Sequence, residues 1–231
     1  MTTDALMESR LQKRMERTHS YLAEQDAEAA VTSAKLAHAI LDDIIASIKP
    51  GMLESEVRKY ATQCFAEYGI EEMWHPPYVR FGGHTLLTFM DAAKEDKTLG
   101  ENDIAFVDIG IVKNGIEGDA GRSIVLGDNP EYQKLAAASY EIFQEAKQFW
   151  QTHNPTGTEL YKYIYQLADK MGVVWNLDPA GHLIGAFPHR GWKRGINHYP
   201  EHIESGKWIL EIQIKHSALP IGAFFEDLLY G

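Results

Sequence analysis

The sequence has very little cysteine and no long apolar run. Cys64 is the single cysteine among 231 residues, which rules out an intramolecular disulfide and fits a reducing compartment. The first residues carry no apolar stretch of the kind found in secretory signals, and no segment approaches the roughly 18 apolar residues of a membrane span. We therefore expect a soluble, cytoplasmic protein that does not interact with a membrane.

Positive charge is also scarce. The chain has 22 lysines and arginines against 33 aspartates and glutamates, which gives a formal net charge of -11. The basic residues are scattered along the sequence, and an acidic chain repels phosphate backbones, so we expect no binding to nucleic acid. Bound cations would offset several of the carboxylates that contribute to this charge.

Helices and strands follow one another in an order that occurs twice. Apolar residues at helical spacing predict a first helix from residue 36 to the stop at Pro50-Gly51, and a second over residues 54–68. Alternating patterns then predict strands over 104–112 and 123–126. A further pair of helices, 130–150 and 159–171, precedes a strand over 207–215 and a last one around Glu226.

This order predicts an α+β fold with two similar halves. No linker rich in proline, serine and glycine separates them, so we expect one domain over residues 34–231. Residues 1–33 are polar and charged with few apolar positions, and we expect them to form an N-terminal helical extension.

Four acidic residues stand in strand-like, largely apolar segments. Asp108 shares a face with apolar residues of the strand 104–112, and Asp119 follows it across a glycine-punctuated turn. Glu211 interrupts an apolar strand, and Glu226 lies in a short apolar stretch. A buried carboxylate without a partner is costly, so it must be protonated, pair with a cation or bind a metal. A salt bridge or a turn cap is the alternative for each acid taken alone.

One imidazole joins these acids, because His182 follows a glycine between the last predicted helix and the strand 207–215. Carboxylates with a single histidine and no thiolate suit Mn, Fe, Co or Zn. Bridging carboxylates can hold two such ions close together. The residues thus indicate a site for divalent cations.

The order and spacing of five short motifs resemble the pita-bread metallopeptidases, the family of methionine aminopeptidase, prolidase and creatinase. The resemblance runs from about residue 34 to the end of the sequence and implies a pita-bread fold, with helices packed on a curved, mostly antiparallel sheet. The motifs are Val107-Asp108-Ile109-Gly110, Gly118-Asp119-Ala120-Gly121-Arg122-Ser123, Ala180-Gly181-His182-Leu183-Ile184-Gly185, Leu210-Glu211-Ile212 and Phe225-Glu226-Asp227.

The resemblance implies a site with two divalent metal ions and names its ligands. In such enzymes the ions supply hydroxide from water near neutral pH, which attacks an amide or peptide bond of a small or short-peptide substrate. Glu211 would relay a proton, and His189 would contact the scissile carbonyl, although a plain loop histidine is its alternative. Arg122 would hold one of the ligand carboxylates. The implied ligands are Asp108, Asp119, His182, Glu211 and Glu226.

The sequence departs from the family at positions that face the substrate. Family peptidases carry a histidine some way before the first aspartate motif, whereas residues 87–91 here contain none. His84 is a possible substitute, and His75 reads as an ordinary loop histidine. Ile212-Gln213 replaces the usual Pro-Gly, and Arg190 replaces an acid.

These departures leave three functions open. A hydrolase of the aminopeptidase or Xaa-Pro dipeptidase kind comes first. A non-peptidase metalloenzyme follows, with creatinase-like C–N cleavage or metal-dependent redox chemistry on a small molecule. An inactive binding module ranks last because all five implied ligands are present. A homodimer is expected by analogy and from aromatic residues near Trp192 and Tyr199, which we expect to be exposed.

Overall fold

The structure, a computed structural model, describes residues 3–177 and 180–231. None of the helices in this part of the chain is both long and apolar enough to cross a membrane. The helices are α1 (Thr3–Glu24), α2 (Ala27–Ser47), α3 (Glu54–Glu67), α4 (Pro130–His153) and α5 (Gly157–Lys170), with 3-10 helices η1 (Gly82–Leu86) and η2 (Ile196–His198). The strands are β1 (Glu72–Phe81), β2 (Asp103–Lys113), β3 (Ile116–Leu126), β4 (Val174–Trp175), β5 (Gly181–Leu183), β6 (Trp208–Lys215) and β7 (Gly222–Leu228).

Polar side chains cap the first turns of two helices, one at a predicted boundary and one upstream of its predicted start. Asp26 caps α2 by accepting hydrogen bonds from the backbone N–H groups of Glu28 and Ala29, so α2 begins well before residue 36. Asn129 caps α4 just before Pro130 in the same way. The predicted division after residue 33 falls inside α2, which is continuous there, and this division stays a prediction.

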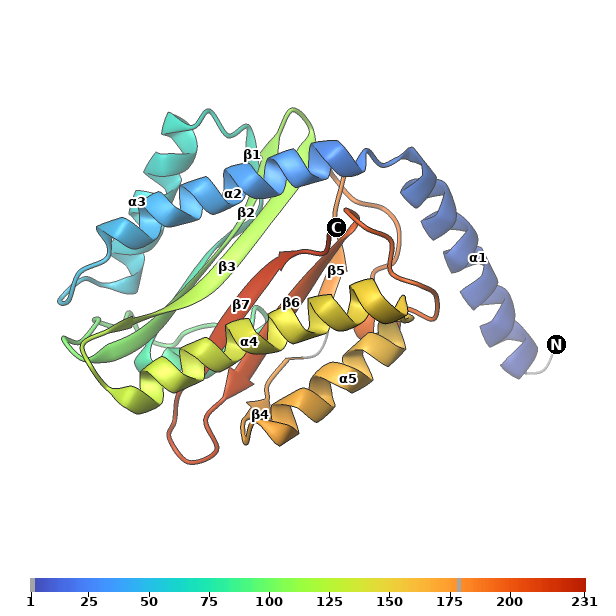
Figure 1. Cartoon of the computed structure of the whole chain (residues 1–231). Coiled ribbons are helices and arrows are strands. Elements are labelled where there is room, and N and C mark those ends of the chain that lie inside the picture. The colour runs from blue at the N-terminus through green and yellow to red at the C-terminus, as the bar shows by residue number, and fades with distance from the viewer. Residues whose placement is uncertain (1–2, 178–179) are drawn as a thin grey trace.

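The strands form one antiparallel sheet in the order β1-β2-β3-β7-β6-β4, and β5 pairs with β6. The hairpin β2–β3 and the hairpin β6–β7 meet where β3 pairs with β7. In Figure 1, α2 lies over the first hairpin and α4 over the second, while α3 packs beside β1 and α5 beside α4 and β4. The predicted α+β fold with two similar halves is therefore confirmed.

Alternation along the strands divides each into a core face and an open face. On β6, Trp208, Leu210, Ile212 and Ile214 are buried in the core that α4 and α5 cover. The residues between them, including Glu211, face the other way. Helices thus cover one side of the sheet, and the acids predicted from the sequence lie on the other.

Strand β1 is not predicted from the sequence because Pro76 and Pro77 interrupt it. Proline cannot donate to a sheet ladder and is tolerated at an edge, and β1 is the edge strand of this sheet. The pairing of β1 with β2 shifts register on both sides of His75, between Glu72 and His75 and again between His75 and Tyr78. His75 itself is paired with Gly110 on β2.

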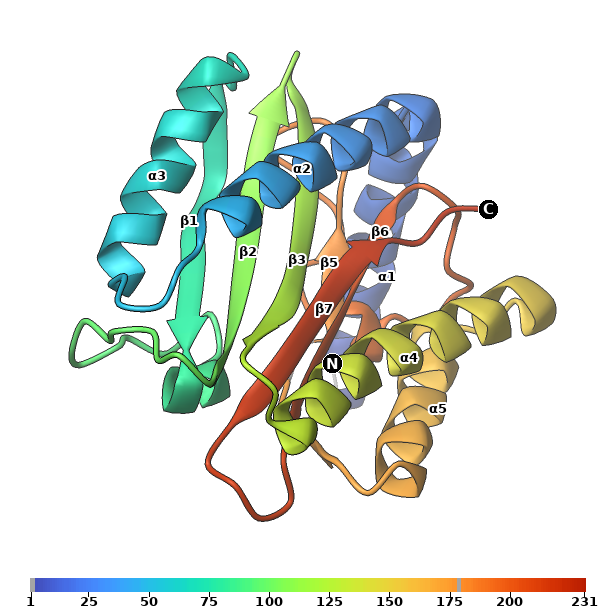
Figure 2. The same cartoon turned by 60° about the vertical axis from the view of Figure 1, so that its left-hand side comes forward.

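Helix α1 stands apart from the other helices and runs beside the loop that follows β5 (Figure 2). Its Tyr21 hydroxyl donates to the carbonyl of Ala186 in that loop, at 3.3 Å. Trp192 and Tyr199 are each only 1% exposed, so the expectation that they form an exposed aromatic surface is wrong. A homodimer gains no support from them.

Candidate metal centre

Register places three of the predicted acids side by side. Asp108 on β2 pairs with Gly121 on β3, Gly121 pairs with Glu226 on β7, and Glu226 pairs with Glu211 on β6. Register partners in antiparallel strands point to the same face of the sheet. Asp119 precedes Gly121 by two residues and shares that face. The four acids therefore meet on the open side of the sheet.

Gly121 leaves the space in which these carboxylates meet. A Cβ atom at this position would lie 2.6 Å from Glu226 Oε1, 2.6 Å from Phe224 Cε1 and 3.1 Å from Asp108 Cβ. A side chain here would therefore push Asp108 and Glu226 apart.

His182 comes to the acids from β5. Its Nε2 atom lies 3.0 Å from Asp119 Oδ2 and 3.5 Å from Glu211 Oε1, while Nδ1 is 2.8 Å from the carbonyl oxygen of Leu183. When Nδ1–H donates to this carbonyl, the Nε2 lone pair of the neutral ring faces the carboxylates. This is the tautomer that a metal ligand needs.

His75 reaches the same acids from the opposite side, which corrects its assignment as a loop histidine. Its Nε2 atom lies 3.3 Å from Asp108 Oδ1 and 3.5 Å from Asp119 Oδ1, and its Nδ1 is 2.8 Å from the carbonyl oxygen of Pro76. In the sequence, His75 could have been found as a histidine upstream of the strand that carries Asp108. Pro76 and Pro77 obscure this signal because they interrupt the strand pattern around it.

His84 does not take the place of the missing upstream histidine. Its Nδ1 atom lies 3.0 Å from Oε1 of the buried Glu54. His84 also does not line the cavity into which the four acids and His182 open. Arg122 does not hold a ligand carboxylate either, because it pairs at 2.5 Å with Asp42 on α2. Residues three apart on a strand point to opposite faces, so Arg122 faces away from Asp119.

The donor atoms fit divalent cations. One ligand atom each from His75, Asp108 and Asp119 lies within 4.8 Å of the others. Glu226 Oε1 is buried and has no hydrogen-bond partner among residues 3–177 and 180–231, and the buried Asp108 Oδ1 has no hydrogen bond there but an ion-pair contact with His75 Nε2 at 3.3 Å. Buried carboxylate oxygens without a donor are costly, and a cation between them would remove that cost.

The pKa values of the ligands reflect the crowding of these groups. Burial raises the pKa of Asp108 to about 6 and that of Glu211 to about 8, and it also raises the pKa of Glu226. Burial opposes the charged imidazole of His182, but Asp119 and Glu211 outweigh it and raise its pKa to about 9.

The same balance holds for His75, whose pKa Asp108 and Asp119 raise to about 9 against the effect of burial. For Asp119 burial also acts against charge, yet the hydrogen bonds to His182 and His75 outweigh it and lower the pKa. The metal-free cluster thus retains protons that bound cations would displace.

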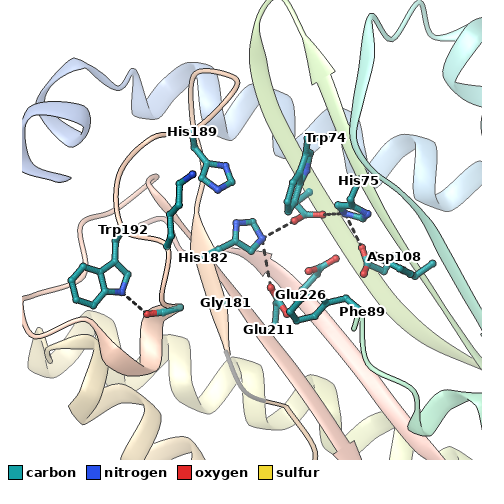
Figure 3. A pocket seen from close by; sticks show the side chains of 14 residues that line it. Trp74, His75, Phe89, Asp108, Gly181, His182, His189, Trp192, Glu211 and Glu226 are labelled. Carbon is teal, nitrogen blue, oxygen red and sulfur yellow. Dashed lines mark hydrogen bonds and ion pairs between the residues drawn. The ribbon is translucent and has the colours of Figure 1, made fainter. Parts of the chain in front are cut away.

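The acids and histidines form the floor of a cavity with a volume of about 290 Å³ (Figure 3). Aromatic residues make up much of its wall, among them Trp74, Tyr78, Phe89 and Trp192. His189 also lines the cavity, and its ring centroid is 5.9 Å from that of His182.

Glu117, which sequence reasoning does not single out, holds His189 in place. The His189 Nδ1 atom is 2.9 Å from Oε2 of this buried glutamate, and the His189 backbone N–H donates to Oε1 at 3.1 Å. When Nδ1–H donates to Glu117, the His189 Nε2 atom stays free to contact a ligand.

Comparison with known families and proteins agrees with this arrangement. Residues 28–230 match the model of metallopeptidase family M24. The chain is 25% identical over 162 residues to a methionine aminopeptidase of Aquifex aeolicus, a match that covers 65% of this chain and 62% of that protein. It is 28% identical over 116 residues to an uncharacterized peptidase of Staphylococcus aureus, covering 50% of this chain and 31% of the relative.

Solved structures with the same fold include an X-Pro aminopeptidase from Thermotoga maritima, with a TM-score of 0.74, 18% identity and coverage of 93% of this chain and 60% of that one. The prolidase from Pyrococcus furiosus has a TM-score of 0.71 at 22% identity, with coverage of 94% and 64%. The chain spans less than two thirds of the length of these two proteins and of both relatives above. This chain belongs to metallopeptidase family M24 and has its pita-bread fold.

Proposed function

We propose that this chain is a hydrolase that binds two divalent metal ions and cleaves an amide or peptide bond of a short substrate. The ions would be held by Asp108, Asp119, His182, Glu211 and Glu226, with Asp119 and Glu226 between them. One observation carries the proposal: these five side chains converge at the floor of one cavity, where two buried carboxylate oxygens have no hydrogen-bond partner among the described residues.

His75 belongs to the proposed site as a further ligand beside Asp108 and Asp119. Its Nε2 atom is near both carboxylates, and its Nδ1 atom has the same kind of backbone carbonyl partner as that of His182. An imidazole on each side of the acids suits Mn, Fe, Co or Zn.

The roles of the residues follow from their positions. Bound ions would supply Lewis-acid polarisation of the scissile carbonyl and make a nearby water molecule more acidic. Glu211, once bound ions have displaced its proton, would accept a proton from that water molecule and pass it to the leaving group. His189, oriented by Glu117, would donate a hydrogen bond to the carbonyl oxygen as charge develops on it.

A non-peptidase metalloenzyme on this scaffold is the second candidate. The chain beside the site differs from the family pattern, because Gln213 follows Ile212 and donates to the backbone carbonyls of Thr85 at 3.2 Å and Leu87 at 3.0 Å, although neither Ile212 nor Gln213 lines the cavity. These bonds tie the segment that lacks the upstream histidine to β6. An inactive binding module ranks third, since the ligand set converges.

The proposal also covers the domain bounds, the cellular location and the oligomeric state. We place the catalytic domain at residues 34–231 and assign residues 1–33 to an N-terminal helical extension. A cytoplasmic location rests on the single cysteine, and a homodimer rests on analogy alone.

The test combines elemental analysis with assays of a dipeptide panel after loading with Mn, Fe, Co or Zn. Glu226→Gln should lose metal and activity. Asp227→Asn is the matched control, because Asp227 is next to Glu226 on β7 but pairs with His38 at 2.9 Å. Metal binding without cleavage of any dipeptide would favour the non-peptidase candidate. A protein that binds no metal would overturn both enzymatic functions.

A further inference from the structure

A second hollow, with a volume of about 590 Å³, shares Lys193 with the cavity above the metal centre. Seven of its eight lining residues are lysines or arginines, whereas the whole chain has 22 of them and a formal net charge of -11. The cations that are scattered in the sequence thus gather at one place. We name this place the basic hollow, and its cations are Arg10, Lys13, Arg14, Arg17, Arg190, Lys193 and Arg194.

Two segments far apart in the sequence build the basic hollow. Arg10, Lys13, Arg14 and Arg17 have the spacing that places side chains on one face of a helix, here α1. The other three cations lie on the loop after β5, and the Arg14 guanidinium carbon is 5.5 Å from the centre of the Trp192 ring in that loop. All of α1 precedes the residues 28–230 that match the family model, so the four cations that α1 contributes lie outside the family match.

None of the seven cations is neutralised by an ion pair within the described residues. All seven are exposed. Helix α1 also carries acidic side chains: Glu16 accepts a hydrogen bond from the neutral Gln12, and Glu201 near the helix pairs with His19. Like charges gathered in a concave surface create a strong positive potential, which attracts anions.

The chemistry of the hollow suits anionic groups. Five of the seven cations are arginines, whose planar guanidinium groups bind a carboxylate or a phosphate through two parallel hydrogen bonds. Lys193 lines both cavities and Trp192, its neighbour, lines the cavity of the metal centre. Because Lys193 lines both cavities, an extended peptide bound at the metal centre can continue into the hollow.

We propose that the substrates of this site are acidic peptides, whose carboxylates bind in the basic hollow while the scissile bond lies over the metal centre. This inference rests on the proposed peptidase function for its catalytic part. Binding of the acidic segment itself needs no catalysis. The hollow adjoins the cavity of a metallopeptidase-family site, which favours a peptide over the phosphates of a nucleic acid.

The test measures binding and cleavage separately. Fluorescently labelled hexapeptides of glutamate, glutamine or lysine, and a labelled single-stranded oligonucleotide, are titrated against the wild-type chain. They are also titrated against Arg10→Gln/Lys13→Gln/Arg17→Gln, which leaves Arg14 over Trp192. The control variant Lys35→Gln/Lys59→Gln/Lys162→Gln changes the net charge equally on α2, α3 and α5. Circular dichroism and thermal unfolding check that both variants fold.

We expect the glutamate peptide to bind best, to lose about tenfold in affinity in the α1 variant, and to keep its affinity in the control. Raising the salt concentration should weaken this binding. Equal binding of glutamate and glutamine peptides, equal affinity in the two variants, or tighter binding of the oligonucleotide would each overturn the inference.

Cleavage of neutral and acidic peptides separates the two proposals. Charge-dependent binding without cleavage of any peptide would support the basic hollow as a binding site for acidic peptides and would contradict the peptidase function. Cleavage that shows no preference for acidic peptides, with no charge-dependent binding, would contradict the role of the basic hollow and would support the peptidase function. The control variant should cleave an uncharged dipeptide as fast as the wild type.

Discussion

Two imidazoles with the same backbone anchoring face the four carboxylates from opposite sides. His182 and His75 each place Nδ1 near a main-chain carbonyl oxygen and Nε2 near Asp119. Such an anchor fixes the ring before a cation arrives, so little conformational freedom is lost on binding. Substitution of a histidine therefore gives the sharpest test of the site, because the orientation of each ring, and not only its presence, is specific.

His75→Gln should weaken metal binding by about 10- to 100-fold, because it removes the imidazole beside Asp108 and Asp119. Isothermal titration with Mn²⁺ measures the affinity, and the absorption spectrum of the Co²⁺-loaded chain reports the change in coordination. His153→Gln is the control, since His153 is exposed at the end of α4. Unchanged affinity and an unchanged Co²⁺ spectrum in His75→Gln would show that His75 is not a ligand.

Metal affinity should rise with pH. Neighbouring carboxylates outweigh burial and raise the pKa values of His75 and His182 to about 9, and burial raises that of Glu211 to about 8. Below these values the metal-free site holds protons that an incoming ion must displace, so affinity falls as the pH falls. We expect it to increase from pH 6 to pH 9 and to level off above pH 9.

Titration calorimetry in buffers with different ionisation enthalpies measures this proton release directly. The number of protons released per ion should decrease as the pH approaches 9. An affinity that stays constant from pH 6 to pH 9, without proton release, would contradict the assigned pKa values.

Among the elements, the strands around Gly121 decide whether the acids can meet. Gly121→Ala places a Cβ atom 2.6 Å from both Glu226 Oε1 and Phe224 Cε1. We expect this substitution to destabilise the chain by about 1–3 kcal/mol and to reduce metal content. In Gly100→Ala, by contrast, the nearest atom to the new Cβ is Asp103 Oδ2, at 3.5 Å, an ordinary contact. Chemical denaturation and elemental analysis of both variants make the comparison, and equal metal content would count against the role of Gly121.

The sequence predicts most elements of this fold and the acids of the site, but not His75. The acids are predictable because a carboxylate stands out in an apolar strand, as Glu211 does between Leu210 and Ile212. His75 is hidden because β1 contains two prolines and shifts its register, and these features depend on its position at the edge of the sheet. The basic hollow is unpredictable for a similar reason, since its cations come together only when α1 packs against a distant loop.

At the scale of the whole molecule, the sheet joins two similar halves. Helix α1 lies outside both halves and packs against the loop whose Trp192 and Lys193 line the cavity of the metal centre. Met15, Tyr21 and Leu22 of α1 belong to the same core cluster as Trp192 and Trp208. The helix is therefore part of the folded core at its C-terminal end, while its cations face the basic hollow. Docking of α1 and formation of the hollow are expected to depend on each other.

Leu22→Ala tests this dependence, because Leu22 is only 1% exposed in the core. Removing a buried leucine side chain typically costs about 2–5 kcal/mol, so Tm should fall by at least about 4 °C in a chain of this size. Leu11→Ala on the same helix is the matched control, since Leu11 is 43% exposed and its loss should change stability by no more than about 0.5 kcal/mol. Thermal unfolding followed by circular dichroism compares the two. If α1 were an independent extension, both variants would unfold at the wild-type temperature, and the basic hollow would lose the docked helix on which it depends.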